Sequence, residues 1–334
     1  MVGLGVLLVV IGLVSAASGQ FAIAPGDIFS SILRKVGIGA ASDQTRLIDS
    51  TLWQVRFPRL VLSMIVGAAL AVAGALMQGV FNNPLAEPGV IGVSSGCAVG
   101  ACAVIVFNLD AHVSLVLPLV ALIGGLLVAA AVYTLARTGG RADTVTLLLI
   151  GIAINAVAGA VVAFLIFIAD TASREQIVFW QMGSLNGATW PAVRDAAIIA
   201  VIGVAGAMLI RRKIDVLALG ESAAGHVGIN VERVKRQAIL FAALLSAGAV
   251  AYAGLIAFVG LVIPHLLRLL IGPSNRALIP ASAIGGAILL AGADILSRTM
   301  VAFADLPIGI FTALIGGPVF FALLRKRVLG GLGR

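Results

Sequence analysis

Unbroken apolar segments fill most of this chain, and short polar segments separate them. A helix that crosses a membrane needs about 20 apolar residues, and continuous runs without polar–apolar alternation favour helices over a β-barrel. The pattern therefore predicts an all-α polytopic membrane protein with about ten transmembrane helices. The run at 261–271 is short, which predicts an irregular or partly embedded helix there. The predicted spans cover residues 2–17, 60–81, a segment from Val90, 114–136, 145–168, 193–210, 238–257, 261–271, 278–296 and 308–324.

Composition supports the same class of protein. Of the 334 residues, 61% are hydrophobic and only 11% are charged, whereas soluble domains carry about 25% charged residues. Such a chain cannot cover a water-facing surface, so we expect a single transmembrane domain over residues 1–334. The 40 glycines suit helices that approach each other closely inside a bilayer.

The positive charges indicate the orientation. The net charge of +8 points to cytoplasmic loops, which collect Lys and Arg, rather than to nucleic acid. An even number of spans places both termini on one side, and a cytoplasmic location puts most cations in short inner loops. We expect a multi-pass protein of the cytoplasmic (inner) membrane with Trp53, Trp180 and Trp190 at the outer boundary. No Lys or Arg precedes the first apolar run, which favours a retained span over a signal peptide. We expect a polar loop over residues 20–54 after this span.

The largest inner loop covers residues 211–236 and is too polar to span a membrane. Its pattern predicts two short helices, around residues 215–220 and 221–227, with a glycine-rich joint. A loop of this size at the cytoplasmic face is either a docking surface for a partner protein or a solvated linker.

Motifs for catalysis are scarce. The chain has no G-x-x-x-x-G-K-[ST] phosphate loop and no H-E-x-x-H metal motif. Its only cysteines, Cys97 and Cys102, both lie within an apolar run. We therefore expect no metal site, no cofactor bound by this chain and no enzymatic activity. Without a phosphate loop in this chain, any ATP and Mg²⁺ that its activity requires would be bound by a partner subunit.

Two functions of another class stay open as alternatives. The stretch Gly92-Val93-Ser94-Ser95-Gly96 fits the G-x-S-x-G motif of serine hydrolases, and an intramembrane serine protease would then use His265 or His226 as base. Asp294 lies in a predicted span, and intramembrane acids can relay protons, as in a proton-coupled secondary transporter. However, Asp294 precedes Arg298 by four residues, so a helical i,i+4 ion pair is the simpler explanation.

Motifs along nearly the whole chain carry a resemblance to a known family. They are Arg56-Phe57-Pro58-Arg59, Asn83-Pro84-Leu85-Ala86-Glu87-Pro88-Gly89, Leu219-Gly220-Glu221-Ser222-Ala223-Ala224, Gly260-Leu261-Val262-Ile263-Pro264-His265, Ala293-Asp294, Leu306-Pro307-Ile308-Gly309 and Gly316-Gly317-Pro318-Val319-Phe320-Phe321. With these motifs the chain resembles the FecCD-type permease subunits of type II ABC importers for haem, iron-siderophores and cobalamin. The resemblance implies a homodimer around a central path, a pair of cytoplasmic ABC ATPase subunits and an extracytoplasmic solute-binding protein.

The resemblance also implies roles for individual residues. Docking of the binding protein would involve Arg56, Arg59 and Arg298, although arginines at an interface can also snorkel. Coupling to the ATPase would involve Leu217, Leu219, Gly220, Glu221, Ala223, Ala224, Gly225, His226, Gly228 and Arg233. The inner gate would comprise Asn83, Leu85, Arg141, Asp143 and Thr144. The translocation path would be lined by Gly151, Asn155, Gly159, Ala163 and Met182, of which the first four also fit a helix-packing face.

For the substrate, the resemblance favours haem. Residues 147–159 and 179–190 look most like the haem permeases of the family, and aromatic and Met side chains beside a cavity suit a flat apolar ring. Trp180 and Trp190 also fit interface anchors, so a ferric siderophore and then cobalamin are kept as alternatives. The expected function is ATP-driven import of haem from an extracytoplasmic binding protein into the cytoplasm.

Overall fold

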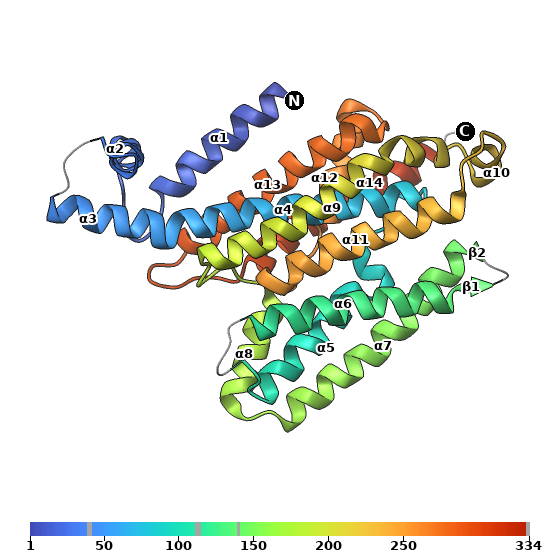
Figure 1. Ribbon diagram of the computed structural model, residues 1–334, viewed down its shortest axis with the longest axis horizontal. Coiled ribbons are helices and arrows are strands. Elements are labelled where there is room, and N and C mark those ends of the chain that lie inside the picture. Colours follow the sequence, from blue (N-terminus) through green and yellow to red (C-terminus); the bar gives the residue numbers. More distant parts are fainter. Residues whose placement is uncertain (39–41, 111–114, 139–140, 332–334) are drawn as a thin grey trace.

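The computed structural model describes residues 1–38, 42–110, 115–138 and 141–331. Its long helices run roughly along one axis (Figure 1). Within these ranges, six helical stretches are long and apolar enough to cross a membrane, and four apolar helices are shorter. The six stretches contain α4 (Phe57–Val80), α6 (Val116–Leu135), α7 (Thr144–Ile168), α9 (Trp190–Leu217), α11 (Val231–Ala253) and α13 (Asn275–Thr299). The shorter helices are α1 (Val2–Ala17), α5 (Val93–Val106), α12 (Val259–Ile271) and the apolar part of α14 (Ile308–Gly331).

The predicted all-helical membrane fold is confirmed, and each predicted apolar segment overlaps one of these helices. The number of ten spans stays a prediction, because only six stretches have spanning length. Helix α12 is short and contains Pro264, as the short apolar run predicted.

Helix α4 forms the centre of the larger helix group. Most of its residues are buried, and α9, α11, α12 and α13 pack around it. Two glycines allow the closest approaches: a Cβ at Gly67 would overlap the carbonyl oxygen of Gly286, and a Cβ at Gly74 would overlap that of Gly260. Only glycine fits where two helix backbones meet this closely.

A second helix group contains α5, α6, α7 and α8 (Thr171–Met182) and lies beside the first (Figure 1). It joins the larger group where α6 packs on α11. Between α6 and α7, the short strands β1 (Arg137–Thr138) and β2 (Arg141–Ala142) pair as an antiparallel hairpin. The 3₁₀ helix η2 (Pro88–Ile91) connects the α4 end to α5.

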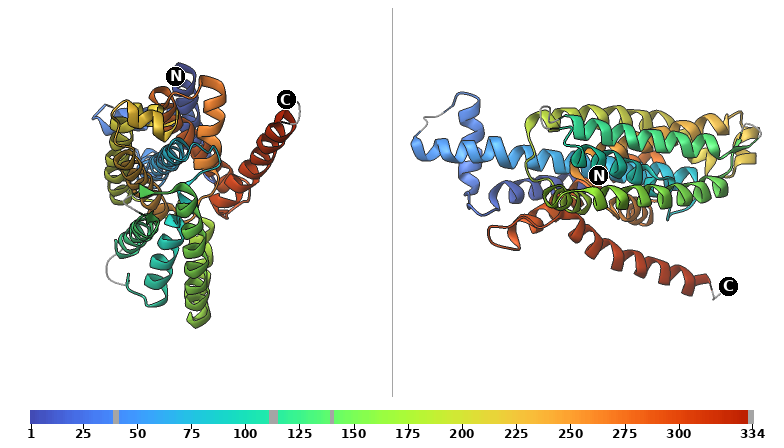
Figure 2. Two further views of the ribbon diagram at one scale, coloured as in Figure 1. Left: turned by 90° about the vertical axis from the view of Figure 1, so that its right-hand side faces the viewer. Right: turned by 90° about the horizontal axis from the view of Figure 1, so that it is seen from below.

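Helix α14 leaves the bundle that the other helices form (Figure 2). Its side chains Leu314 and Phe321 are exposed on the isolated subunit. Helix α7 is similarly uncovered, because only Leu147, Gly151, Ala158 and Leu165 of its residues are buried. These two helices therefore leave large apolar surfaces for lipid or for another protein chain.

The outer region corrects one expectation. Residues 20–54 were expected to form a polar loop, but they contain α2 (Pro25–Lys35), α3 (Asp43–Ser50) and the π-helical η1 (Thr51–Arg56). The last two continue into α4, so one 36-residue helical stretch covers Thr45–Val80. At about 1.5 Å per residue this stretch exceeds the roughly 30 Å of a bilayer core. The stretch is therefore longer than one membrane span requires.

The loop at residues 211–236 corrects a second expectation. The predicted helix at 215–220 is wrong, because α9 continues through Asp215 to Leu217. The carboxylate of Asp215 accepts the backbone N–H of Asn275 at 2.6 Å and so caps the start of α13, where a negative charge is favourable. The second predicted helix is present as α10 (Glu221–His226).

Candidate gate, coupling and docking sites

The turn after α4 is a compact polar element at the end of the bundle that the sequence predicts to face the cytoplasm, the inner end. Asn82 adopts a left-handed backbone conformation with φ 45°, which asparagine tolerates better than most residues. The side-chain oxygen of Asn83 accepts the N–H of Leu85 at 3.0 Å. Burial raises the pKa of the nearby Glu87 carboxyl. The predicted gate residues Asn83 and Leu85 thus lie together in one turn, which their hydrogen bond stabilises.

Four residues of α7, Gly151, Asn155, Gly159 and Ala163, form a row along one face of the helix. The half of this row that contains Gly151 and Asn155 attaches α7 to the turn. Asn155 donates from its amide nitrogen to the carbonyl oxygen of Gly89 at 3.2 Å and accepts from the hydroxyl of Ser95 at 2.7 Å. A Cβ at Gly151 would overlap the carbonyl oxygen of Val90. Gly151 and Asn155 therefore pack inside the subunit.

The outer half of the same row is uncovered. A Cβ at Gly159 would meet no atom within 4 Å, and Ala163 is exposed. The predicted path residue Met182 ends α8, and its carbonyl oxygen touches the backbone of Gly309 so closely that a Cβ there would overlap it. The row is thus divided between a packed half and an open half.

The second gate element is the β1–β2 hairpin with the start of α7. Asp143 caps α7, because its carboxylate accepts both the N–H and the hydroxyl of Thr146 at 2.9 Å. These hydrogen bonds hold the pKa of Asp143 below its usual value. Thr144 is the first residue of α7. Arg141 belongs to β2, and its side chain lies outside the described residues.

The predicted coupling segment projects from the inner end around α10. Leu219 is 75% exposed, and Glu221, Ala223, Gly225, His226, Gly228 and Arg233 are exposed as well. Leu217 and Ala224 are buried and anchor the segment. Gly220, with φ 108°, and Gly228, with φ 81°, turn the chain before and after the helix, in a region that favours glycine.

Two charged residues near this segment, Glu232 and Lys235, were missed by the sequence analysis. Glu232 accepts hydrogen bonds from the hydroxyl of Tyr133 and from the N–H of Ala142, and the ammonium of Lys235 donates to the carbonyl oxygen of Ala142 and to Glu221. The available signal was a pair of opposite charges at helical spacing in front of an apolar span. Their partners could not be read from the sequence.

The three predicted docking arginines lie together at the opposite end of the bundle, which the sequence predicts to face away from the cytoplasm (the outer end), and all are buried. Arg59 binds Asp294 at 2.7 Å and Asp305 at 2.9 Å. Arg298 lies 3.3 Å from Asp294 and donates to the carbonyl oxygen of Ser15 at 2.6 Å. The predicted i,i+4 pair of Asp294 and Arg298 is therefore present.

Arg56 has no carboxylate partner among the described residues. It donates to the carbonyl oxygens of Ala16, Ala17 and Phe21, at and beyond the C-terminal end of α1. A cation is favourable at the C-terminal end of a helix. The group formed by the three arginines and the acids Asp294 and Asp305 thus carries excess positive charge and joins α1, α4 and α13.

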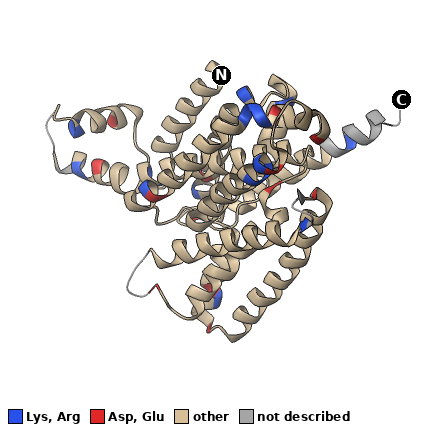
Figure 3. Cartoon of the chain, turned by 45° about the vertical axis from the view of Figure 1, so that its right-hand side comes forward, with Lys and Arg blue, Asp and Glu red and all other residues tan. Residues whose placement is uncertain are grey.

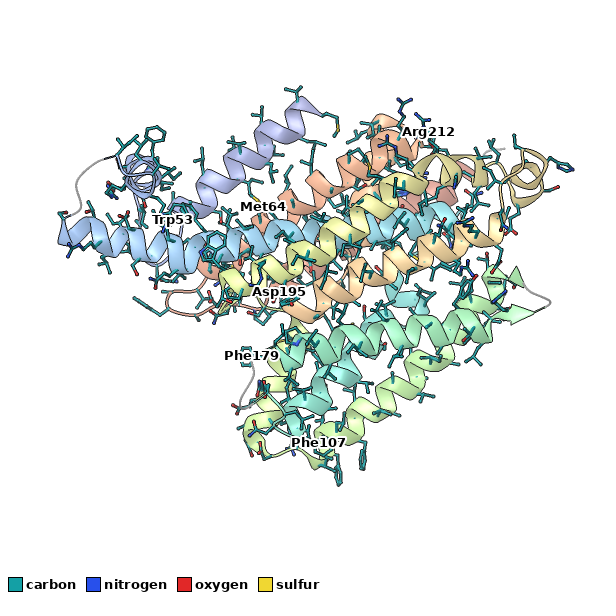
Figure 4. The ribbon with its side chains drawn as sticks, viewed as in Figure 1. Trp53, Met64, Phe107, Phe179, Asp195 and Arg212 are labelled. Atoms are coloured by element: carbon teal, nitrogen blue, oxygen red, sulfur yellow. The ribbon has the colours of Figure 1, made fainter. Side chains whose placement is uncertain are left out.

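Aromatic residues mark the same end. The indole N–H of Trp190 donates to the carbonyl oxygen of Trp53 at 2.7 Å, and the rings of Trp53 and Phe57 lie edge to face at 4.9 Å. A pocket of about 830 Å³ opens nearby, with Trp180, Tyr252 and Arg194 in its lining. Figure 4 shows Trp53 and Arg212 at opposite ends of the bundle.

Charged side chains are absent from the described parts of α6 and α7 and gather near helix ends and connections (Figure 3). This distribution is that of a protein embedded in lipid. The G-x-S-x-G stretch opens α5, where a Cβ at Gly96 would overlap the carbonyl oxygen of Gly124 and Ser95 bonds to Asn155. The motif therefore serves helix packing.

Comparison with known proteins identifies the family. The profile of the FecCD transport family matches residues 7–326. The chain belongs to the FecCD transport family. The hemin transport system permease protein HmuU of Yersinia pestis is 42% identical over 308 residues, covering 88% of this chain and 92% of HmuU. The cobalamin import system permease protein BtuC of Halobacterium salinarum is also 42% identical, over 278 residues, 83% of this chain and 74% of BtuC.

The fold agrees with this membership. A solved structure described as an inward-facing conformation of a metal-chelate type ABC transporter superposes with a TM-score of 0.85 and 30% identity, covering 97% of this chain and 98% of the other. This FecCD protein is therefore a transmembrane permease of the ABC importer class, as its motifs predicted. No comparison favours a secondary transporter or an intramembrane protease.

Proposed function

We propose that this permease moves haem from an extracytoplasmic binding protein to the cytoplasm, driven by ATP hydrolysis on separate ATPase subunits. The observation that carries the choice of haem is the similarity to the hemin permease, which extends over 92% of that protein. The cobalamin permease shares the same identity over a shorter alignment, so cobalamin is the direct competitor and a ferric siderophore is the third candidate.

The subunit functions as a homodimer in this proposal. Helix α14 departs from its own bundle (Figure 2), and α7 exposes Val157, Phe164 and Phe167. A second copy packed against these surfaces would enclose a path lined by apolar and small residues, including Gly159 and Ala163. Such a lining suits a flat apolar ring and binds it weakly enough to release it.

The two ends of the subunit take different partners. At the outer end, the positive group of Arg56, Arg59 and Arg298 would attract acidic residues of the binding protein, which gives steering and register more than affinity. At the inner end, the exposed coupling segment around α10 would contact the ATPase. This arrangement requires both termini in the cytoplasm and places the protein in the inner membrane. The whole chain, residues 1–334, acts as one permease domain.

Transport would follow from movement of the inner gates. ATP binding brings the ATPase subunits together and displaces α10, and the turn at Asn83–Leu85 and the β1–β2 hairpin change position. This is alternating access by movement of largely rigid elements.

Reconstituted transport tests the proposal. The permease and its ATPase are placed in proteoliposomes, and binding protein loaded with haem, ferrichrome or cobalamin is added outside. ATP-dependent uptake of haem alone is expected. Uptake of cobalamin or ferrichrome instead would overturn the substrate. Uptake that follows a proton gradient and needs no ATPase would overturn the mechanism.

A further inference from the structure

A buried lysine at the inner end connects three elements of the fold. Lys235 lies in the second turn of α11, and its side chain is only 3% exposed. Its ammonium donates to the carboxylate of Glu221 on α10 and, at 3.3 Å, to the carbonyl oxygen of Ala142 in β2. Because a buried ammonium is costly without partners, both contacts are needed to hold the charge there.

Two side chains of α11 hold the hairpin by binding the backbone carbonyl and the backbone N–H of Ala142. While Lys235 binds the carbonyl oxygen of Ala142, the N–H of Ala142 donates to Glu232 at 3.1 Å. Glu232 is oriented in turn by the hydroxyl of Tyr133 at the end of α6. Ala142 is 2% exposed, so the position of β2 depends on these two side chains.

Packing alone does not join α10 to the hairpin. A pocket of about 550 Å³ lies between them, lined by Ala142, His226 and Glu232 among others. Helix α10 has only six residues, and of these only Ala224 is buried. The pair of Glu221 and Lys235 is therefore the polar bridge across this space.

We propose that Lys235 is a positioning residue that transmits displacement of α10 to the β1–β2 hairpin and the start of α7. This inference rests on the proposed docking of an ATPase at α10. Glu221 is 59% exposed at the start of that helix, within reach of such a partner. When α10 moves, Glu221 draws the ammonium with it, and the hydrogen bond to Ala142 carries the hairpin along.

Two variants separate the arms of this connection. Glu221→Gln removes the charge on α10 and leaves Lys235 bound to Ala142. Lys235→Met keeps the length of the buried stem and removes both contacts. Glu221→Asp keeps the charge and should retain the connection. Arg276→Met removes an exposed cation on α13, at the same end and outside the connection, and is the matched control.

The first measurement uses the permease alone in nanodiscs. Spin labels are placed at the exposed positions Ser222 on α10 and Val145 at the start of α7, and both native cysteines are buried. The distribution of distances between the labels is expected to broaden in Glu221→Gln and in Lys235→Met. It should stay narrow in Glu221→Asp and in Arg276→Met. Unchanged distributions in the first two variants would overturn the proposal.

The second measurement uses the complete importer with its ATPase and binding protein. The number of substrate molecules imported per ATP is expected to fall at least about fivefold in Lys235→Met, the lower range of typical coupling, while ATPase assembly is kept because the Lys235 side chain is buried. A normal ratio in a variant with broadened distances would also overturn the proposal. If the parent complex neither assembles nor imports, the proposed function fails, and the distances in the permease alone still decide whether Lys235 joins α10 to the hairpin.

Discussion

Replacing Asp294 by asparagine tests how the outer end of the subunit is held together. Asp294 is fully buried in α13, and its carboxylate lies 2.7 Å from Nε of Arg59 and 3.3 Å from Nε of Arg298. It is thus the acid shared by two buried cations. Asparagine keeps the shape and one acceptor oxygen, so the substitution removes the charge with little change in packing.

The expected destabilisation follows from the burial of both partners. Removing one member of a buried ion pair costs about 3–5 kcal/mol, because the other charge is left uncompensated. We expect the lower value, since Arg59 keeps its bond to Asp305 and Arg298 keeps its bond to the carbonyl oxygen of Ser15. About 3 kcal/mol corresponds to a fall in Tm of roughly 6–12 °C, taking about 2–4 °C per kcal/mol.

The two native cysteines provide the assay. Cys97 and Cys102 are free and buried, so a maleimide dye that fluoresces on reaction with thiols reports unfolding directly. Asp195→Asn is the matched control, because it breaks the pair with Arg194 at 2.8 Å, whose arginine side chain is 70% exposed. Exposed pairs contribute about 0–1 kcal/mol, so this control should shift Tm by no more than about 4 °C.

An intermediate case makes the test stricter. Asp305 is 30% exposed and pairs with Arg59, so the Tm of Asp305→Asn should fall between those of the other two variants. If Asp294→Asn melted at the same temperature as Asp195→Asn, the reasoning that burial governs this ion pair would be refuted.

Three further predictions concern packing, the gate and a helix cap. Gly74→Ala should prevent assembly of a folded subunit, because the new methyl overlaps the Gly260 backbone, whereas Gly159→Ala, with open space around it, should fold normally by size-exclusion chromatography. Asn155→Leu should free the turn at Gly89, and limited proteolysis there should accelerate. The hydrogen bonds from Thr146 lower the pKa of Asp143. The cap that Asp143 forms on α7 therefore contributes its full stability above the pKa of the unfolded chain, and this stability is lost as pH falls through the lower pKa of the folded protein. Amide exchange at the start of α7 should therefore rise only below the usual range of aspartate.

Hydropathy predicted the apolar helices well because lipid leaves the backbone few options. Each apolar segment had to become a helix, and α12 was short where its apolar run was short. The prediction of a polar loop at residues 20–54 was wrong, because a hydropathy pattern detects apolar spans and not amphipathic helices. Helix α2 is amphipathic and polar enough to resemble a loop. Its position is fixed by Arg34, which binds Asp49 on α3 at 2.9 and 2.7 Å. That contact depends on the fold and is invisible to a hydropathy pattern.

In the candidate sites, contacts within one helix could be predicted and contacts between distant parts of the chain could not. The pair of Asp294 and Arg298 could be predicted, because four residues along a helix bring side chains together. Arg59 and Asp294 are 235 residues apart, and Ala142 and Lys235 are 93 apart. No local spacing relates such residues. Family motifs pointed to the arginines and to α10, but only the fold shows that the arginines are bound within the subunit and that Lys235 joins α10 to the hairpin.

The two ends of the subunit are held by contacts of different strength, and this difference indicates where it can move. At the outer end, Arg59 and Asp294 are both buried, with side chains 10% and 1% exposed. At the inner end, Lys235 is buried but its partner Glu221 is largely exposed, and water weakens such a pair. Opening the outer contact would separate two buried charges, whereas opening the inner contact would leave only the Lys235 ammonium buried, with the carbonyl oxygen of Ala142 as its remaining partner. We therefore expect α10 and the hairpin to move while α1, α4 and α13 stay together as the rigid frame.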